Sequence, residues 1–419
     1  MIYEGKILWI YIAFLLTFGE LLGLFFPKMF LRVIYIALMI WIFFKHMYKR
    51  EFRLRLENFD KLIFLYIFYM TLLFVWQCIT GNLTSSSLVS FIQTIVPVLL
   101  FFIAKGINDD DASDIEQIYA FFSALSIGLG IINKYFKFLP STGTFAGGLY
   151  AYVGENSYEE RAYSMAGSAL ITGFISALLV CFIIDKFEKR PLKMRLLNFV
   201  LLIIGILGCL LSLSRGAIAF LGIFCICYVF LSRKNRLRMI KKRIVLSTLF
   251  VFFIGVFFVT SKWESIKNSS IYNRFVTVGV SQDEASNAGR IEFQQEAIAY
   301  IKKKPICGMG FGYSGYQASV ADVDTYINAE SYIILLGINS GIIGITLFVL
   351  IFLRVVCEAC FYEKKYIYKY VSLIVGMFAW SVMYILLESD LIAIFYWYSI
   401  GRVFSKEKRM CQKVIIKYK

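Results

Sequence analysis

Two arginines, one glutamate and a run of glycines are the residues of this 419-residue chain whose types and spacing could do chemistry. Arg215 stands in a short polar segment between two apolar runs, Arg290 lies about 75 positions later in a long polar stretch, and Glu330 ends that stretch. A guanidinium makes two parallel charge-assisted hydrogen bonds to a phosphate and stays protonated where the dielectric is low. The arginines therefore predict a clamp on a pyrophosphate.

Arg215 and Glu330 each lie at the edge of an apolar run, and each position can be interpreted in two ways. An arginine held at a membrane boundary is usually functional unless it is paired or hydrated, but the Arg215 side chain could also extend to the lipid headgroups. Glu330 precedes Ser331-Tyr332 and a further apolar stretch. Its carboxylate could act as a general base toward a hydroxyl, or it could simply be favoured by the dipole of a helix N terminus.

The glycines form the segment Gly308-Met309-Gly310-Phe311-Gly312-Tyr313. Glycine permits positive backbone angles and a close approach to a ligand, so Gly308, Gly310 and Gly312 are candidate substrate-binding positions. The segment is not a nucleotide phosphate loop, because the terminal Lys-Ser/Thr and a preceding strand are lacking. The alternative is a simple turn between two amphipathic segments.

The composition places these residues in a membrane protein. Hydrophobic residues make up 59% of the chain and charged residues 17%, whereas soluble domains carry about 25% charged residues. The net charge of +16 is explained by lysine and arginine kept in cytoplasmic loops, so nucleic acid is not an expected partner.

The cysteines and the histidine support no outer metal site. Most of the nine cysteines lie in apolar runs and only Cys307 lies in the long polar stretch, so no disulfide framework is expected. Cys357 and Cys360 form one isolated C-x-x-C, which we interpret as incidental. The one histidine, His46, lies in a basic loop; this excludes a histidine metal site or a serine-histidine triad on the opposite side.

The pattern of apolar runs predicts an all-α polytopic fold of about 12 transmembrane helices in a single membrane domain, residues 1–419. A spanning helix needs about 20 mostly apolar residues. The candidate runs are 7–26, 29–44, 62–79, 88–104, 118–133, 168–184, 197–213, 217–231, 244–260, 338–356, 371–386 and 389–403. The first run continues without a cleavage site, so it is not expected to be a signal peptide.

The lysines and arginines predict the orientation. If both termini are cytoplasmic, the inner segments hold 31 of the 44 basic residues, as the positive-inside rule requires. Two long segments then lie outside the membrane, a smaller loop at 134–167 and the long loop at 261–330. No internal repeat is visible, so the inverted-repeat signature of many transporters is missing.

The long loop is expected to contain an amphipathic helix from about Gly289 to Lys303. Asn287 is its predicted N-cap, apolar residues recur at helical spacing from Phe293, and Pro305 stops it. Arg290 would then lie in the first turn, where the backbone amides and the helix dipole favour an anion.

In their order, these motifs resemble a known family. The segments Leu211-Ser212-Leu213-Ser214-Arg215-Gly216, Arg290 in a long outer loop, Pro305 to Gly312, Glu330-Ser331-Tyr332 and Gly337 to Gly344 resemble the O-antigen polymerase and ligase superfamily, the Wzy-type polymerases of bacterial polysaccharides. The resemblance covers roughly residues 160–355. It departs from the ligases, which usually carry a His-Asn pair where this chain has Glu330-Ser331.

The resemblance implies a metal-independent glycosyltransferase without a cofactor, in the cytoplasmic (inner) membrane of a bacterium, with an undecaprenyl-pyrophosphate-linked oligosaccharide as donor. Arg215 and Arg290 would hold the pyrophosphate, Arg161 matches a further arginine before a span, and Glu330 would take the proton of the acceptor hydroxyl. Other polysaccharide-assembly proteins, a chain-length regulator or a flippase, are candidate partners. Aromatic residues that could stack on sugar rings, or equally belong to an interfacial belt, are Tyr313, Tyr316, Tyr326 and Tyr332.

Three functions remain open from the sequence. The first is a polymerase of lipid-linked repeat units for O antigen, capsule or exopolysaccharide, and the second is a ligase that transfers a finished glycan. The third is a lipid or polysaccharide transporter, for which charges near the middle of the membrane would be expected. Such charges are scarce here, and Glu20 is one example.

Overall fold

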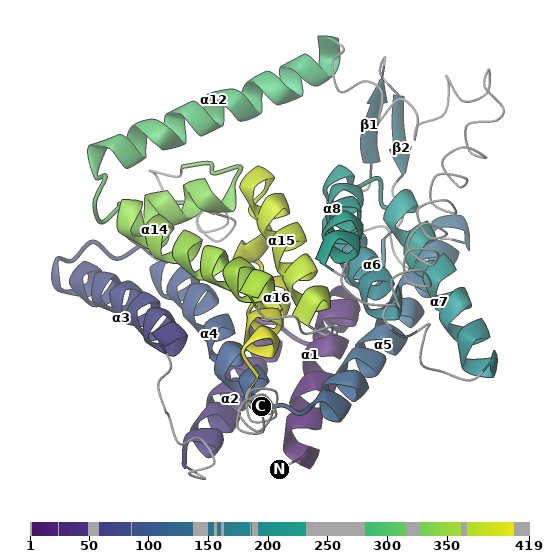
Figure 1. The fold of residues 1–419 in the computed structure, drawn as a ribbon. Helices are drawn as coiled ribbons and strands as arrows, with labels where there is room; N and C mark the ends of the chain where they lie inside the picture. The colour runs from purple at the N-terminus through teal and green to yellow at the C-terminus, as the bar shows by residue number, and fades with distance from the viewer. Residues whose placement is uncertain are drawn as a thin grey trace. The chain divides into compact units, whose positions relative to one another are not determined.

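A computed structural model shows that the chain is a multi-pass helical membrane protein (Figure 1). The structure describes residues 2–23, 25–48, 58–84, 86–136, 150–154, 157–160, 163–184, 186, 192–231, 281–315, 327–361 and 367–405.

The helices follow the predicted apolar runs closely. They are α1 (Ile2–Gly23), α2 (Lys28–Tyr48), α3 (Asn58–Ile79), α4 (Ser87–Lys105), α5 (Asp109–Phe136), α6 (Ala169–Ile184), α7 (Leu192–Leu211), α8 (Arg215–Leu231), α12 (Ser281–Lys303), α14 (Tyr332–Phe361), α15 (Ile367–Met383), the short 3₁₀ helix η3 (Leu386–Glu388) and α16 (Asp390–Val403). Eleven of the twelve predicted runs coincide with a helix, and the run 244–260 lies outside the described residues.

Length and composition identify the membrane spans. Four described helices are long and apolar enough to cross a bilayer, namely α3, α4, α5 and the part of α14 from Tyr332 to Glu358. Shorter apolar helices occur in α1, α6, α7, α8 and α15. The predicted all-α polytopic class is therefore confirmed.

A small β-hairpin occupies part of the predicted outer loop 134–167. Strand β1 (Tyr150–Gly154) pairs antiparallel with β2 (Ser157–Glu160), with an irregularity in the register between Tyr152 and Gly154. The alternation of small and aromatic residues in this loop is compatible with a strand pair, which was not predicted from the sequence.

The chain divides into two compact units, which are described separately. Unit 1 comprises Met1–Tyr35 and Asp109–Ser286, and unit 2 comprises Ile36–Asn108 and Asn287–Lys419. Unit 1 contains α1, α5, α6, α7, α8 and the hairpin; unit 2 contains α3, α4 and the helices from α14 onward.

Small residues bring the helices of unit 1 close together. A Cβ on Gly205 of α7 would collide with Val180 of α6, and one on Gly208 would collide with Ser176 of α6. A Cβ on Gly173 of α6 would lie 2.8 Å from that of Ala217 of α8. Lipid provides no hydrophobic driving force between helices, so such close backbone packing is what holds spanning helices together.

Unit 2 is built around α4 and α16, which pack along each other. A Cβ on Gly401 of α16 would lie 2.5 Å from the carbonyl oxygen of Phe101 on α4. At one end of this pair Phe59 stacks on Phe404 with a centroid separation of 3.8 Å. Helix α14 packs against α3 and α15 (Figure 1).

A buried ion pair joins the start of α3 to the end of α4. Both carboxylate oxygens of Asp60 accept hydrogen bonds of 2.7 Å from Lys105 Nζ, and the two side chains are 4% and 2% exposed. The attraction of two charges at this distance offsets their desolvation only while both are present.

Helix α12 differs from the helix predicted for the long loop. It begins at Ser281 rather than near Gly289, so Asn287 is not its N-cap, and Arg290 lies in the third turn rather than the first. The helix dipole acts within the first turn, so it does not assist Arg290. Of the predicted apolar stripe, Ala297 is fully buried but Phe293 is 40% exposed.

Candidate functional site

The glycine segment folds as predicted into a left-handed backbone. Gly308, Gly310 and Gly312 have φ angles of 73°, 103° and 89°, and Gly315 follows with 92°. Because side chains strongly disfavour these angles, only glycine fits here without strain. We call residues 308–315 the glycine loop.

One glutamine anchors the glycine loop to unit 2. Gln77, near the end of α3, accepts a 2.9 Å hydrogen bond from the Phe311 backbone N–H and donates one of 2.9 Å to the Phe311 carbonyl. Its amide thus pairs with the Phe311 backbone as a neighbouring strand would, and it also donates to Asn82 O and Ser87 Oγ. Gln77 is 3% exposed, so these contacts are sheltered from water.

The turn between α3 and α4 supplies further anchors to the same loop. Ser87 Oγ donates to the Phe311 carbonyl at 2.7 Å, and Ser86 Oγ donates to the Gly312 carbonyl at 2.8 Å. The Tyr313 hydroxyl donates to the carbonyl of Asn82 at 3.2 Å. The turn therefore satisfies loop carbonyls that would otherwise be buried without partners.

The loop is also tied to a break in α14. Gly341 has φ 63° and ψ −164° inside this helix, so the helix is kinked there. The Met309 N–H donates to Ile338 O at 2.6 Å and the Ile342 N–H donates to Pro305 O at 2.8 Å. Backbone groups released by the kink are thus paired again, as a spanning helix requires.

Protein groups fill the space beside the three predicted glycines. A Cβ on Gly308 would lie 2.5 Å from Ile338 O, and one on Gly310 would lie 2.7 Å from Gln77 Oε1. A Cβ on Gly312 would lie 2.6 Å from the Ser87 N. The close approach expected at the glycines is made to α3, α4 and α14, and direct contact with a substrate stays a prediction.

Replacing Gln77 by leucine is expected to release the glycine loop. The Phe311 N–H would lose its partner, and a buried donor without a partner costs about 1–3 kcal/mol. We expect a lower thermal unfolding midpoint in detergent and a loss of activity. Thr80→Ala is the matched control, because Thr80 lies one turn further along and its hydroxyl bonds to Trp76 O, Gln77 O and Asn82 Nδ2 and not to the glycine loop. Equal midpoints for both variants would contradict the anchoring role.

A polar pocket lies beside the glycine loop, between α4, α14 and η3. It is lined by Ser90, Gln93, Thr94, Tyr332, Leu335, Leu336, Asn339, Leu387 and Glu388. Gln93 Oε1 and Asn339 Oδ1 are buried acceptors that have no hydrogen-bond donor among the described residues. The pocket has about 10 Å³ of free volume, which is room for one water or one hydroxyl group and not for a sugar ring.

Glu388 brings a carboxylate to this pocket and to the glycine loop. A Cβ on Gly315 would collide with Glu388 Oε1, so the carboxylate lies directly against the loop backbone. Tyr332 lines the same pocket, and its hydroxyl is hydrogen-bonded with that of Tyr66. A carboxylate, two carbonyl-type acceptors and a hydroxyl are suited to receive the proton and the hydrogen bonds of a hydroxyl group.

The tyrosines predicted to stack on sugars are differently placed. Tyr332 is 8% exposed and packs edge-on against Phe348, so little of its ring is open to a ligand. Tyr313 is half-buried. Tyr316 and Tyr326 lie outside the described residues, and sugar stacking by any of the four stays a prediction.

The predicted arginines lie in both units. Arg215 begins α8 in unit 1, directly after a turn of three residues that follows α7, which confirms that two helices meet there with almost no loop. Arg290 lies on α12 in unit 2, and Arg161 lies outside the described residues. The clamp formed by Arg215 and Arg290 stays a prediction.

The turn before Arg215 is strained. Leu213 has a φ of 51°, a left-handed angle that a leucine adopts at a cost of about 1–2 kcal/mol. Ser214 precedes α8 and its carbonyl accepts from the Ala217 and Ile218 N–H groups. The Arg215 guanidinium and the first amides of α8 both favour an anion at this end.

Glu330 and Glu388 both stand before an apolar helix, but only Glu388 lines the polar pocket. Glu330 is partly exposed one residue before Ser331, whose hydroxyl donates to Ser381 O at 3.4 Å. Glu388 was not among the site residues predicted from the sequence. The signal was present, because Glu388 separates two apolar runs on the side predicted to be outside, as Arg215 does.

The described residues bring no three histidine, cysteine or acidic side chains together in the manner of metal ligands.

The fold and these contacts define a class: a multi-pass helical membrane protein with a glycine loop docked beside a carboxylate. Residues 200–349 match the family model described as O-Antigen ligase. The chain is also 27% identical, over 203 residues, to an "O-antigen polymerase" of Salmonella muenchen. That alignment covers 46% of this chain and 48% of the relative, so it spans about half of the relative's length.

Both comparisons support the O-antigen polymerase and ligase superfamily, so the predicted resemblance is confirmed. The matched range contains Arg215, Arg290, the glycine loop and Glu330. It is narrower than the predicted 160–355, and it includes neither Arg161 nor Glu388.

Proposed function

We propose that this protein polymerises lipid-linked polysaccharide repeat units at the outer face of a bacterial inner membrane, with both termini in the cytoplasm. The donor is a glycan on undecaprenyl pyrophosphate and the acceptor is a sugar hydroxyl. The observation that carries the proposal is the docked glycine loop with Glu388 against it, in a chain whose matched range contains both arginines.

The reaction is a substitution at the anomeric carbon of the donor. A carboxylate takes the proton of the acceptor hydroxyl, and the hydroxyl oxygen forms a bond to the anomeric carbon. The bond from that carbon to the pyrophosphate oxygen breaks, and undecaprenyl pyrophosphate leaves with the electron pair. The bonds and protons of this reaction balance without a metal or a cofactor.

The arginines act on the leaving group. Charge develops on the pyrophosphate as its bond breaks, and preorganised cations stabilise that charge most where water is excluded. Arg215 and Arg290 fit this role because each can make two parallel hydrogen bonds to phosphate oxygens. Lysine lacks this planar pair of N–H donors and presents a point charge instead.

Lysine variants test the clamp. We expect Arg215→Lys and Arg290→Lys each to lower the rate of glycan lengthening by roughly 100-fold, a typical loss when one oxyanion-stabilising donor is removed. The measurement is chain length against time on purified lipid-linked repeat units. Arg195→Lys is the control, because Arg195 is an exposed arginine at the other end of α7. Wild-type rates and lengths in both variants would refute the clamp.

The ligase function is the second candidate, because the matching family model carries that description. A ligase would transfer the finished glycan to a different carrier and would not lengthen it. The same assay separates the two, since a polymerase yields a ladder of lengths and a ligase yields one transferred product. Movement of the lipid carrier across vesicles without any lengthening would instead indicate a transporter.

A further inference from the structure

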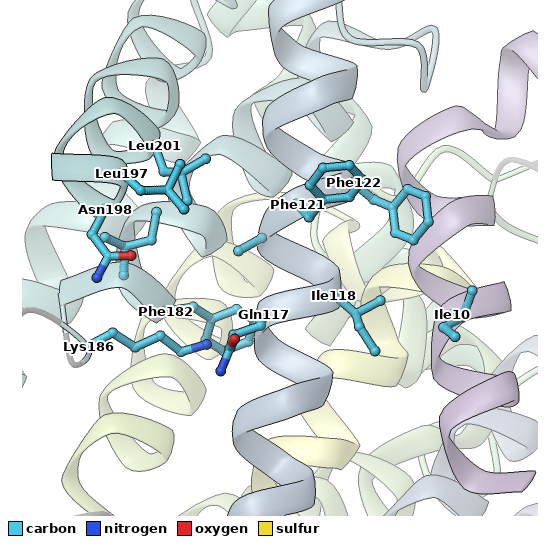
Figure 2. Close-up of a pocket in the computed structure, with 12 residues that line it drawn as sticks. Ile10, Gln117, Ile118, Phe121, Phe122, Phe182, Lys186, Leu197, Asn198 and Leu201 are labelled. Atoms are coloured by element: carbon cyan, nitrogen blue, oxygen red, sulfur yellow. The ribbon is translucent and has the colours of Figure 1, made fainter. Parts of the chain in front are cut away.

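Two hollows among the described residues differ in character. A cavity of about 470 Å³ in unit 1, among α1, α5, α6 and α7, is walled mainly by apolar side chains such as Phe121 and Phe122 (Figure 2). The polar pocket of unit 2 has about 10 Å³ of free volume and is lined by Gln93, Asn339 and Glu388 among others. Because a displacement of about 1 Å at a reacting group can cost roughly 100-fold in rate, the residues that fix the walls of so small a pocket matter for the reaction.

One wall of the polar pocket is a face of the first half of α14. Tyr332, Leu335, Leu336 and Asn339 line the pocket, and their spacing of three, four and seven residues puts them on one side of a helix. The helix is kinked two residues after Asn339, at Gly341. The direction of this wall is therefore set at the kink.

The kink is in backbone contact with the segment that leads into the glycine loop. A Cβ on Gly341 would lie 2.2 Å from Ile306 O, so the approach requires glycine. Backbone hydrogen bonds join residues 305–309 to α14 on both sides of the kink, at Ile338 and at Ile342. The kink and this segment are thus held together.

Tyr69 of α3 adds a side-chain hydrogen bond to this contact. Its hydroxyl donates to Ser340 O at 2.7 Å and lies 3.5 Å from Ile306 O. Since Ser340 directly precedes Gly341, one hydroxyl group reaches both sides of the contact. Tyr69 is not among the residues that line the polar pocket, so its influence on the pocket passes through the kink.

We propose that Tyr69 is a positioning residue for glycan transfer, an inference that rests on the proposed function. Its hydroxyl fixes the kink, and the fixed kink sets the direction of the first half of α14. Asn339 and Tyr332 are thereby held in the pocket to which Glu388 brings its carboxylate. The acceptor hydroxyl can then meet the base without a movement of this wall.

Tyr69→Phe removes only the hydroxyl, and Thr71→Val is the matched control. Thr71 also lies on α3, but its hydroxyl donates within its own helix to Ile67 O. We expect Tyr69→Phe to lower the maximal rate of glycan lengthening roughly tenfold, while the KM for lipid-linked repeat units changes less than about twofold. The reason is that the wall sets the geometry of the reacting groups and not the binding of the lipid carrier. A wild-type maximal rate, or a loss that appears in KM alone, would overturn the proposal.

Hydrogen–deuterium exchange of the full-length protein in detergent measures whether the hydroxyl fixes the kink. Tyr69→Phe should raise deuterium uptake in peptides that contain Met309 or Ile342, whose N–H groups bond across the contact. Thr71→Val should leave that uptake unchanged. Unchanged uptake in Tyr69→Phe would overturn the proposal. This readout does not depend on glycan transfer, so it is separate from failure of the proposed function, in which the wild-type protein would not lengthen the glycan.

A double variant separates positioning from stability. In the Glu388→Gln background the base is absent, so the added Tyr69→Phe change should lower the remaining rate by less than about twofold. A hydroxyl that only stabilises the fold would lower the rate by the same factor in both backgrounds. Equal factors would therefore overturn the proposal.

Discussion

Replacing Glu388 by glutamine is expected to lower the rate of glycan lengthening by at least about 100-fold, because general-base catalysis contributes about 10²–10⁴-fold. Glutamine keeps the size of the side chain but cannot take a proton. Glu388 lies against the glycine loop at Gly315 and lines the polar pocket with Gln93 and Asn339. The measurement is the initial rate on purified lipid-linked repeat units, with donor binding measured separately.

The matched comparison is Glu330→Gln. Both glutamates precede an apolar helix, so loss of a charge alone should change the rate of glycan lengthening alike in the two variants. Loss of the general base should lower that rate in only one of them. A large rate loss in Glu330→Gln with a normal rate in Glu388→Gln would assign the base to Glu330, as the sequence predicts. Equal thermal midpoints for the two variants would show that the rate loss is not a loss of folding.

Breaking the ion pair between Asp60 and Lys105 is expected to cause the largest loss of stability among the changes proposed. Removing one partner from a buried pair costs about 3–5 kcal/mol, because the other charge remains buried and uncompensated. Asp60→Asn and Lys105→Met should therefore each lower the free energy of unfolding strongly. Both side chains are almost fully buried, and both carboxylate oxygens are engaged at 2.7 Å.

The double variant is the sharper measurement. Asp60→Asn combined with Lys105→Met removes both charges, so it should lose much less than the sum of the two single changes. Lys61→Met is the control, since it removes the same charge from an exposed position next to Asp60. Additive losses in the double variant would contradict a direct coupling between the two side chains.

Much of the fold was predictable because each spanning helix must satisfy its own backbone in lipid. This constraint produces long apolar runs, and eleven of the twelve runs became helices. The tight connection before Arg215 and the left-handed glycines followed equally from local sequence. The start of α12 did not, because its first turns are polar and no apolar pattern marks where it begins.

The sequence by itself determined the class of protein, the positions of most of the described membrane helices and the resemblance to a family, because hydropathy and short motifs are local properties. It also named Arg215, Arg290 and Glu330, whose role as a site stays a prediction. Only the tertiary structure decided what the glycine loop rests on. Gln77, which bonds to the loop at Phe311, lies 234 residues earlier in the chain. Glu388, which contacts the loop at Gly315, lies 73 residues later. No local pattern encodes contacts between segments so far apart in the chain.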